Sequence, residues 1–169
     1  MLGPRCFSTR TGKDSMGIFD KIKDVTNMVT GGGARVTLEY DPPTGFPGDS
    51  LSVRVTATST GGQVKSGGVF VDLQAVERVQ MPRGTVSGQE SAVQTSHTTF
   101  NQEFRIAPAF TLAPNETREF EGVVRLPSNV EPTFSGRYTQ HTWSIRGRVE
   151  ATGNDPDSGF QPFRMGSNG

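Results

Sequence analysis

Ser50 is the first residue whose type and setting could do chemistry, because it lies in the short sequence Gly48-Asp49-Ser50-Leu51. A serine becomes a nucleophile when a histidine takes its proton and a carboxylate orients that histidine. Serine esterases with this four-residue sequence place an aspartate three positions before the catalytic histidine. Neither His97 nor His141 has an aspartate at that position. The segment also fits a turn that leads into a strand. A small serine hydrolase that uses Ser50 is therefore the least favoured function.

Patterns for metals and cofactors are weak. Neither histidine has a second histidine, a cysteine or a close carboxylate at ligand spacing, so the sequence predicts no metal site. The segment Asn154-Asp155-Pro156-Asp157-Ser158-Gly159 offers several oxygens, but Pro156 stands where a calcium loop needs a ligand. We interpret this segment as a hairpin turn. The sequence predicts no cofactor and no enzymatic activity.

Arginines are the strongest candidates for binding, because the chain has 13 Arg and only 4 Lys. Arginine forms bidentate pairs with carboxylates and phosphates, whereas lysine acts as a point charge. Arg125, Arg146 and Arg148 fall in predicted strands, opposite the apolar residues, as do Arg35 and Arg54. These arginines either bind acidic or phosphorylated segments of a protein partner or form cross-strand pairs with glutamates. The expected glutamates are Glu39, Glu119, Glu121 and Glu150.

An amphipathic helix is expected at residues 16–29. Apolar residues recur there at helical spacing, with charged and polar residues between them, namely Ile18, Phe19, Ile22, Val25 and Val29. Three glycines at 31–33 end the helix and form a hinge. We interpret Ile18, Phe19, Ile22 and Val25 as a protein-binding stripe, and docking on the chain's own body is the alternative. Residues 1–15 are a flexible leader or an upstream extension, since either Met1 or Met16 could be the start.

The rest of the chain shows the period-two alternation of β-strands. About seven strands follow one another with short turns and without crossover helices, which predicts an all-β, two-sheet antiparallel sandwich. We expect the longest strand at 138–151, with His141 and Trp143 on its buried face, and an exposed connection or ragged hairpin at 81–96. The predicted organisation is a leader at 1–15, the helix and hinge at 16–33, the sandwich at 34–166 and a tail at 167–169.

Composition excludes several classes of function. The chain has 17 basic and 17 acidic residues, so the basic footprint of a nucleic-acid-binding protein is missing. No apolar run in the sequence approaches the ~20 residues of a transmembrane helix. The single cysteine, Cys6, cannot form an internal disulfide, which agrees with a reducing, cytoplasmic location. The expected partners are proteins, while a homo-oligomer and a weak peripheral membrane contact are left open.

Four segments of the body occur in a recognisable order. A turn at Phe46-Pro47-Gly48-Asp49 precedes a strand, and a turn at 112–116 leads to Phe120. Val124-Arg125-Leu126-Pro127 and a proline-bearing loop then precede the long strand that contains Trp143. This order resembles an arrestin-like domain, and in particular the bacterial sporulation-control protein family.

The resemblance covers roughly residues 35–165. It implies an arrestin-like or immunoglobulin-like sandwich and a non-enzymatic adaptor or regulator that acts through protein contacts. The alternative is a structural subunit of a larger assembly, such as a phage or secretion apparatus.

Overall fold

The computed structural model describes residues 33–168. The predicted leader and helix, with the stripe residues Ile18, Phe19, Ile22 and Val25, lie outside the described residues. Between residues 33 and 168 the secondary structure consists of β-strands, which are β1 (Ala34–Asp41), β2 (Thr44–Gly45), β3 (Ser50–Ser59), β4 (Val64–Met81), β5 (Val93–Ala107), β6 (Phe110–Leu112), β7 (Thr117–Arg125), β8 (Phe134–Ser135), β9 (Thr139–Ala151) and β10 (Gln161–Met165).

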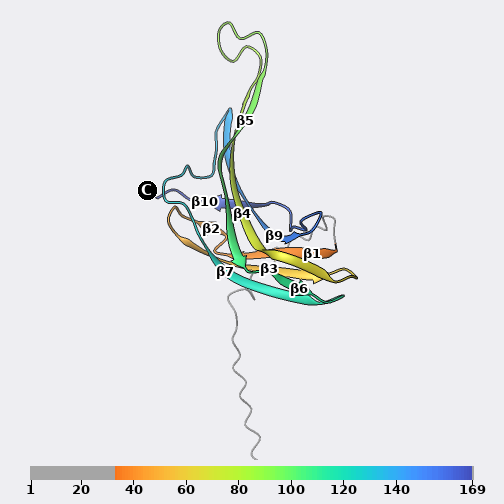
Figure 1. The fold of residues 1–169 in the computed structure, drawn as a ribbon. Coiled ribbons are helices and arrows are strands. Elements are labelled where there is room, and N and C mark those ends of the chain that lie inside the picture. Colours follow the sequence, from red (N-terminus) through yellow and green to blue (C-terminus); the bar gives the residue numbers. More distant parts are fainter. Residues whose placement is uncertain (1–32, 169) are drawn as a thin grey trace, which may run out of the picture.

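The strands form two sheets. The smaller sheet has three strands in the order β1-β3-β7, and the larger has seven, with the path β2-β10-β9-β4-β5 and with β6 and β8 paired to β4 and β9. Pairing is antiparallel throughout except between β10 and β2. In Figure 1 the smaller sheet runs across the lower part of the sandwich, and β4, β5 and β9 of the larger sheet extend upward beyond it. The predicted all-β, two-sheet sandwich is confirmed.

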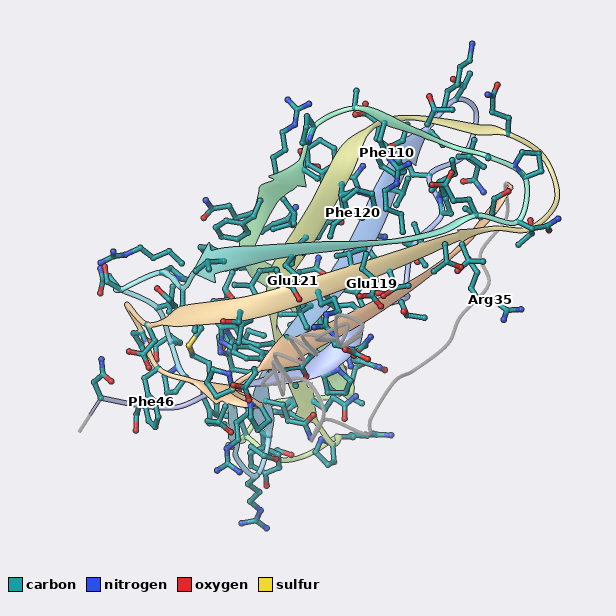
Figure 2. All side chains as sticks on the ribbon, turned by 90° about the horizontal axis from the view of Figure 1, so that it is seen from below. Arg35, Phe46, Phe110, Glu119, Phe120 and Glu121 are labelled. Carbon is teal, nitrogen blue, oxygen red and sulfur yellow. The ribbon has the colours of Figure 1, made fainter. Side chains whose placement is uncertain are left out.

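The core lies between the sheets because side chains alternate along each strand. On β3 the four apolar residues from Leu51 to Ala57 are fully buried, and the residues between them are half-buried. The same alternation on β9 buries Trp143 and Ile145 and turns Arg146 outward. Phe110 and Phe120 close the core between the edges of the two sheets, with ring centroids 4.5 Å apart (Figure 2).

Beyond Val79, where its pairing with β9 ends, the β4–β5 hairpin extends as a two-stranded arm (Figure 1). The sequence predicted a connection or ragged hairpin at 81–96, but β4 continues to Met81 and β5 begins at Val93, directly opposite it. Backbone pairing rather than a core holds these polar residues in strands, which is why side-chain periodicity missed them. β4 is therefore the longest strand, with 18 residues against 13 in β9, contrary to the prediction.

Gly68 lies inside β4. The pairing of β4 with β9 shifts register between Ser66 and Gly68. A Cβ atom on Gly68 would lie 2.9 Å from the carbonyl oxygen of Ala107, so the close approach of the β5 backbone requires glycine here.

The loop 126–133 is fastened to β9 by two buried side chains. The indole N–H of Trp143 donates to the Glu131 carbonyl oxygen at 2.9 Å. Nδ1 of His141 lies 2.8 Å from the Pro132 carbonyl oxygen, and its Nε2 lies 2.7 Å from Oγ1 of Thr99. His141 is thus a hydrogen-bonded core residue, as predicted.

Replacing Trp143, the one tryptophan of the chain, tests this packing. Trp143→Ala should lower the free energy of unfolding by about 3–5 kcal/mol, because it leaves a cavity and removes the donor to Glu131. Trp143→Phe, which keeps an aromatic ring, should cost less. Urea denaturation followed by circular dichroism measures both variants. A native fluorescence maximum typical of water-exposed indole would contradict the burial of Trp143.

Candidate protein-interaction site

An ionic network lies on the outer face of the larger sheet. The register of β4 and β9 places Asp72 opposite Arg146, and Arg148 follows two residues later on the same face. Oδ2 of Asp72 accepts hydrogen bonds from Nη2 and Nε of Arg146 at 2.6 and 2.9 Å. The same oxygen lies 3.4 Å from Nε of Arg148. One carboxylate that is only 6% exposed therefore holds both guanidinium groups.

Neighbouring elements supply three further carboxylates. The segment 152–160, between β9 and β10, contributes Asp157, 3.3 Å from Nη1 of Arg146, and Asp155, 2.9 Å from Nη1 of Arg148. From β5, Glu103 accepts a hydrogen bond from Nη2 of Arg148. The other oxygens of Asp155 and Asp157 accept the backbone N–H groups of Ala151 and Gly159, so the ion pairs also fix the shape of this segment.

Two aromatic rings complete the surroundings of the arginines. The guanidinium carbon of Arg146 lies 4.5 Å from the centroid of the Phe160 ring, and that of Arg148 lies 5.1 Å from the Phe70 ring. Such cation–π contacts restrict the planes of the guanidinium groups. A polar cavity of about 420 Å³ lies beside both arginines and the segment 153–157. The result is a mainly polar surface of paired side chains beside a shallow depression.

The charges of this network are strongly coupled. Burial by itself would lower the pKa of Arg148, but the negative charge of Asp72 and hydrogen bonds to Asp72 and Asp155 outweigh burial and raise that pKa above its ordinary value. The group contains four carboxylates and two guanidinium groups. It therefore carries two more negative than positive charges.

Arg125 lies far from this network, so the three arginines predicted to bind a partner do not form one surface. It is exposed on β7, in the smaller sheet, opposite Ser50 of β3. Buried Val124 points into the core, which turns Arg125 to the outer face of that sheet. Arg146 and Arg148 occupy the outer face of the other sheet. Sequence periodicity gives the face of each strand but not the sheet that the strand joins.

Two of the four glutamates expected to pair with arginines, Glu39 and Glu121, do so on the smaller sheet. Arg54 lies 2.8 Å from Oε1 of Glu121 and 3.7 Å from Oε2 of Glu39. The hydrogen bond that Arg54 donates to Glu121, together with the charges of Glu119, Glu121 and Glu39, raises the pKa of Arg54 against a smaller effect of burial. Figure 2 shows Glu119 and Glu121 over this sheet. The partners of Arg146 and Arg148, by contrast, were not expected from the sequence.

Ser50 has no histidine base in this arrangement. Both ring nitrogens of His141 bond to Thr99 and Pro132, and His97 lies in β5 of the larger sheet, opposite Glu77. Ser50 begins β3 in the other sheet. The hydrogen bond that would activate a catalytic serine is therefore not formed by either histidine.

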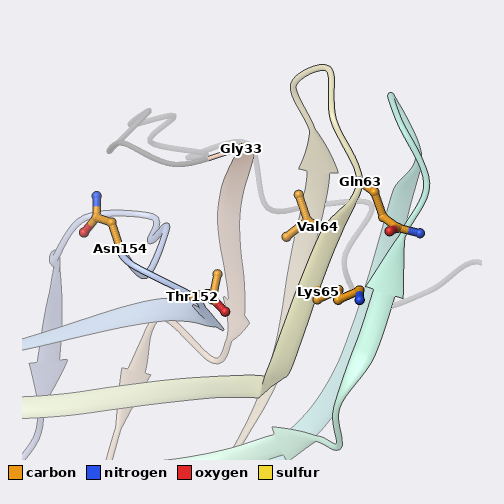
Figure 3. Close-up of a pocket in the computed structure, with 7 residues that line it drawn as sticks. Gly33, Gln63, Val64, Lys65, Thr152 and Asn154 are labelled. Atoms are coloured by element: carbon orange, nitrogen blue, oxygen red, sulfur yellow. The ribbon is translucent and has the colours of Figure 1, made fainter.

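Other parts of the described surface show fewer features of a binding site. A second cavity of about 340 Å³ lies where the described chain begins, beside Gly33, Val64 and Asn154 (Figure 3). Across residues 33–168, no helix combines the length and apolarity needed to cross a membrane. In the same range, no cluster of three or more His, Cys, Asp or Glu side chains is arranged to hold a metal ion.

Removing the central charge tests the network. Asp72→Asn keeps the side-chain shape, but two arginines lose a charged acceptor, so the free energy of unfolding should fall by roughly 2 kcal/mol. Hydrogen exchange in the segment 152–160 should also become faster. Glu121→Gln is the matched control on the other sheet, where the carboxylate is 62% exposed, and it should cost about 0–1 kcal/mol. Equal losses in the two variants would contradict a central role for Asp72.

Comparisons with known proteins bear on the fold. The sequence matches no protein-family model and none of the curated proteins with which it was compared. Among solved structures, it is similar to the crystal structure of Spo0M, a sporulation control protein from Bacillus subtilis, with a TM-score of 0.57 and 18% sequence identity. The match covers 79% of this chain and 49% of that one, so the chain spans about half the length of Spo0M. The arrestin-like sandwich that the sequence resembled is thereby confirmed as the fold.

Proposed function

We propose that this chain is a non-enzymatic protein-binding module that serves as an arrestin-like adaptor or regulator in the bacterial cytoplasm. The likeness to a sporulation control protein supports a regulatory role, and the absence of a Ser50–histidine hydrogen bond supports a non-enzymatic one. Because one fold can host many functions, the proposal depends mainly on the surface around Asp72.

One observation supports the binding role most directly: every side-chain nitrogen of Arg146 and Arg148 has a carboxylate partner. Side chains that are already fixed lose little conformational entropy when a partner binds. A preorganised polar surface beside a cavity is suited to recognise a segment of another protein.

The charge of the network indicates the chemistry of that segment. An acidic or phosphorylated segment, which the arginines alone suggested, must first displace a carboxylate from Arg148. A basic segment instead meets a surface with two excess negative charges, of which Glu103 and Asp155 are the more exposed, at 53% and 36%. We therefore favour a partner segment that contains Lys or Arg. The predicted stripe of Ile18, Phe19, Ile22 and Val25 would provide a second, apolar contact.

Affinity capture from a lysate of the source organism tests the binding role. The full-length chain should retain at least one host protein, and the double variant Glu103→Gln/Asp155→Asn should retain about tenfold less, because a basic segment loses two of its anionic contacts. A peptide array of the captured protein should then locate a Lys- or Arg-rich segment. Glu121→Gln, on the other sheet, is the matched control and should retain the partner.

Equal capture by the double variant would contradict binding at the network. An acidic or phosphorylated segment on the array would contradict the assigned charge while leaving the binding role intact.

The non-enzymatic part has a separate test. A panel of short- and long-chain esters should show no hydrolysis above buffer with the full chain, because no histidine activates Ser50. Hydrolysis that disappears in Ser50→Ala would instead establish the hydrolase alternative.

The second candidate function is that of a structural subunit in a larger assembly. It is favoured by β5, which forms a long edge of the larger sheet and pairs only with β4 among the described residues. Light scattering distinguishes it, since rings or filaments would indicate a structural subunit.

A further inference from the structure

β5 is the least protected edge strand of the sandwich. Natural proteins shield sheet edges with charged residues, proline or short strands. β7 has four charged residues among nine, and β1 has three among eight. The opposite edge of the larger sheet is formed by short strands, β2 with two residues and β10 with five, one of them Pro162. β5 has 15 residues without lysine or proline and only two charges, Glu103 and Arg105.

β5 is also largely open to solvent. Most of its residues are exposed, including Gln102 and Glu103 near its middle. Phe104 and Ile106 are only half-buried against the core. Unpaired backbone N–H and C=O groups along such a strand form a template for another strand. The aromatic and aliphatic side chains beside it would gain burial from that pairing.

The charges around Phe104 are complementary to those of a second, antiparallel copy of β5. If two copies of β5 pair antiparallel about a two-fold axis through Phe104, Glu103 of each copy lies opposite Arg105 of the other. Residues directly opposite in an antiparallel pair share a face of the sheet, so the two ion pairs form on the same outer face. The two Phe104 rings meet across the axis on the inner face. Axes through Glu103 or Arg105 would instead place like charges opposite each other.

We propose that the chain forms a two-fold dimer through β5, with the pairing centred on Phe104 and extending over residues 103–105. A two-fold contact of this kind is self-complementary and closes after two copies. On one side, the bulge at Ile106, between the pairs of Arg105 and Ala107 with β4, interrupts the regular edge ahead of Pro108, which has no backbone donor. On the other side, the bulge at Thr99, between the pairs of Phe100 and Thr98 with β4, interrupts the regular edge. The dimer would join two larger sheets into one continuous sheet.

The dimer and the proposed partner site share Glu103 but otherwise use different groups. The dimer also uses Arg105 and the backbone of the β5 edge, whereas the partner site also uses Asp155 on the segment 152–160. Arg105→Glu and Asp155→Asn therefore test the two proposals separately. A protein that dimerises but captures no partner, or the reverse, would separate the two proposals.

The experiment measures the mass of the full chain by light scattering and sedimentation between about 1 and 100 µM. Wild type should be a dimer at the upper end of this range. Arg105→Glu places like charges opposite each other twice, so its dissociation constant should rise by at least about tenfold. The exchanged double variant Glu103→Arg/Arg105→Glu restores both opposite-charge pairs and should recover the dimer.

A mixing experiment gives the sharpest result. Glu103→Arg and Arg105→Glu should each be mainly monomeric alone, but an equimolar mixture should form a heterodimer, because every facing pair is then of opposite charge. Arg125→Glu on β7 is the control and should leave the wild-type mass unchanged. Thermal unfolding checks that Glu103→Arg, which also loses the bond to Arg148, is folded. A wild-type monomer at 100 µM, or a dimer that Arg105→Glu does not weaken, overturns the proposal. A dimer that is lost only on Phe19→Ser/Ile22→Ser overturns it as well.

Discussion

The central position of β4 is the constraint on which the rest of the larger sheet depends. β4 pairs with β9 along one edge and with β5 and β6 along the other. Its inner face supplies Val69, Val71, Leu73 and Ala75 to the core, all fully buried. Its outer face places Asp72 between two arginines of β9. At its C-terminal end, β4 extends beyond the sandwich and forms the arm with β5. One strand thus determines the core, the ionic network and the projecting hairpin.

Period-two patterning predicted the fold because each core strand shows it locally. Leu51 to Ala57 and Trp143 to Val149 alternate within a few residues, so their buried faces can be assigned without knowing their neighbours. The beginning of β5 could not be found in this way. Residues 93–96 are held in the strand by pairing with residues 78–81 of β4, and because they are exposed, no buried face imposes an alternation on them.

The ionic network was only half predictable, for a different physical reason. The sequence indicated that Arg146 and Arg148 face outward, but Asp72 lies 74 residues from Arg146 along the chain. Only the register of β4 against β9 brings them together. Asp155 and Asp157 were interpreted as residues of a hairpin turn. They lie in the connection between β9 and β10, where Asp157 forms a β-bridge with Arg148, and this connection brings their carboxylates to the arginines. The same lack of register information placed Arg125 with Arg146 and Arg148, although its strand belongs to the other sheet.

The two proposed binding surfaces differ in what they leave for a partner. Around Asp72, both arginines already have carboxylate partners, so a second protein meets a fixed surface with a net negative charge. Electrostatic attraction there favours specificity and fast encounter more than great affinity. Along β5, the side chains are mostly neutral and the backbone offers the hydrogen bonds. Backbone hydrogen bonds do not depend on side-chain type. In a strand with two charges, specificity for a partner therefore comes from the positions of those charges. Glu103 and Arg105, on either side of Phe104, are placed so that the chain selects itself.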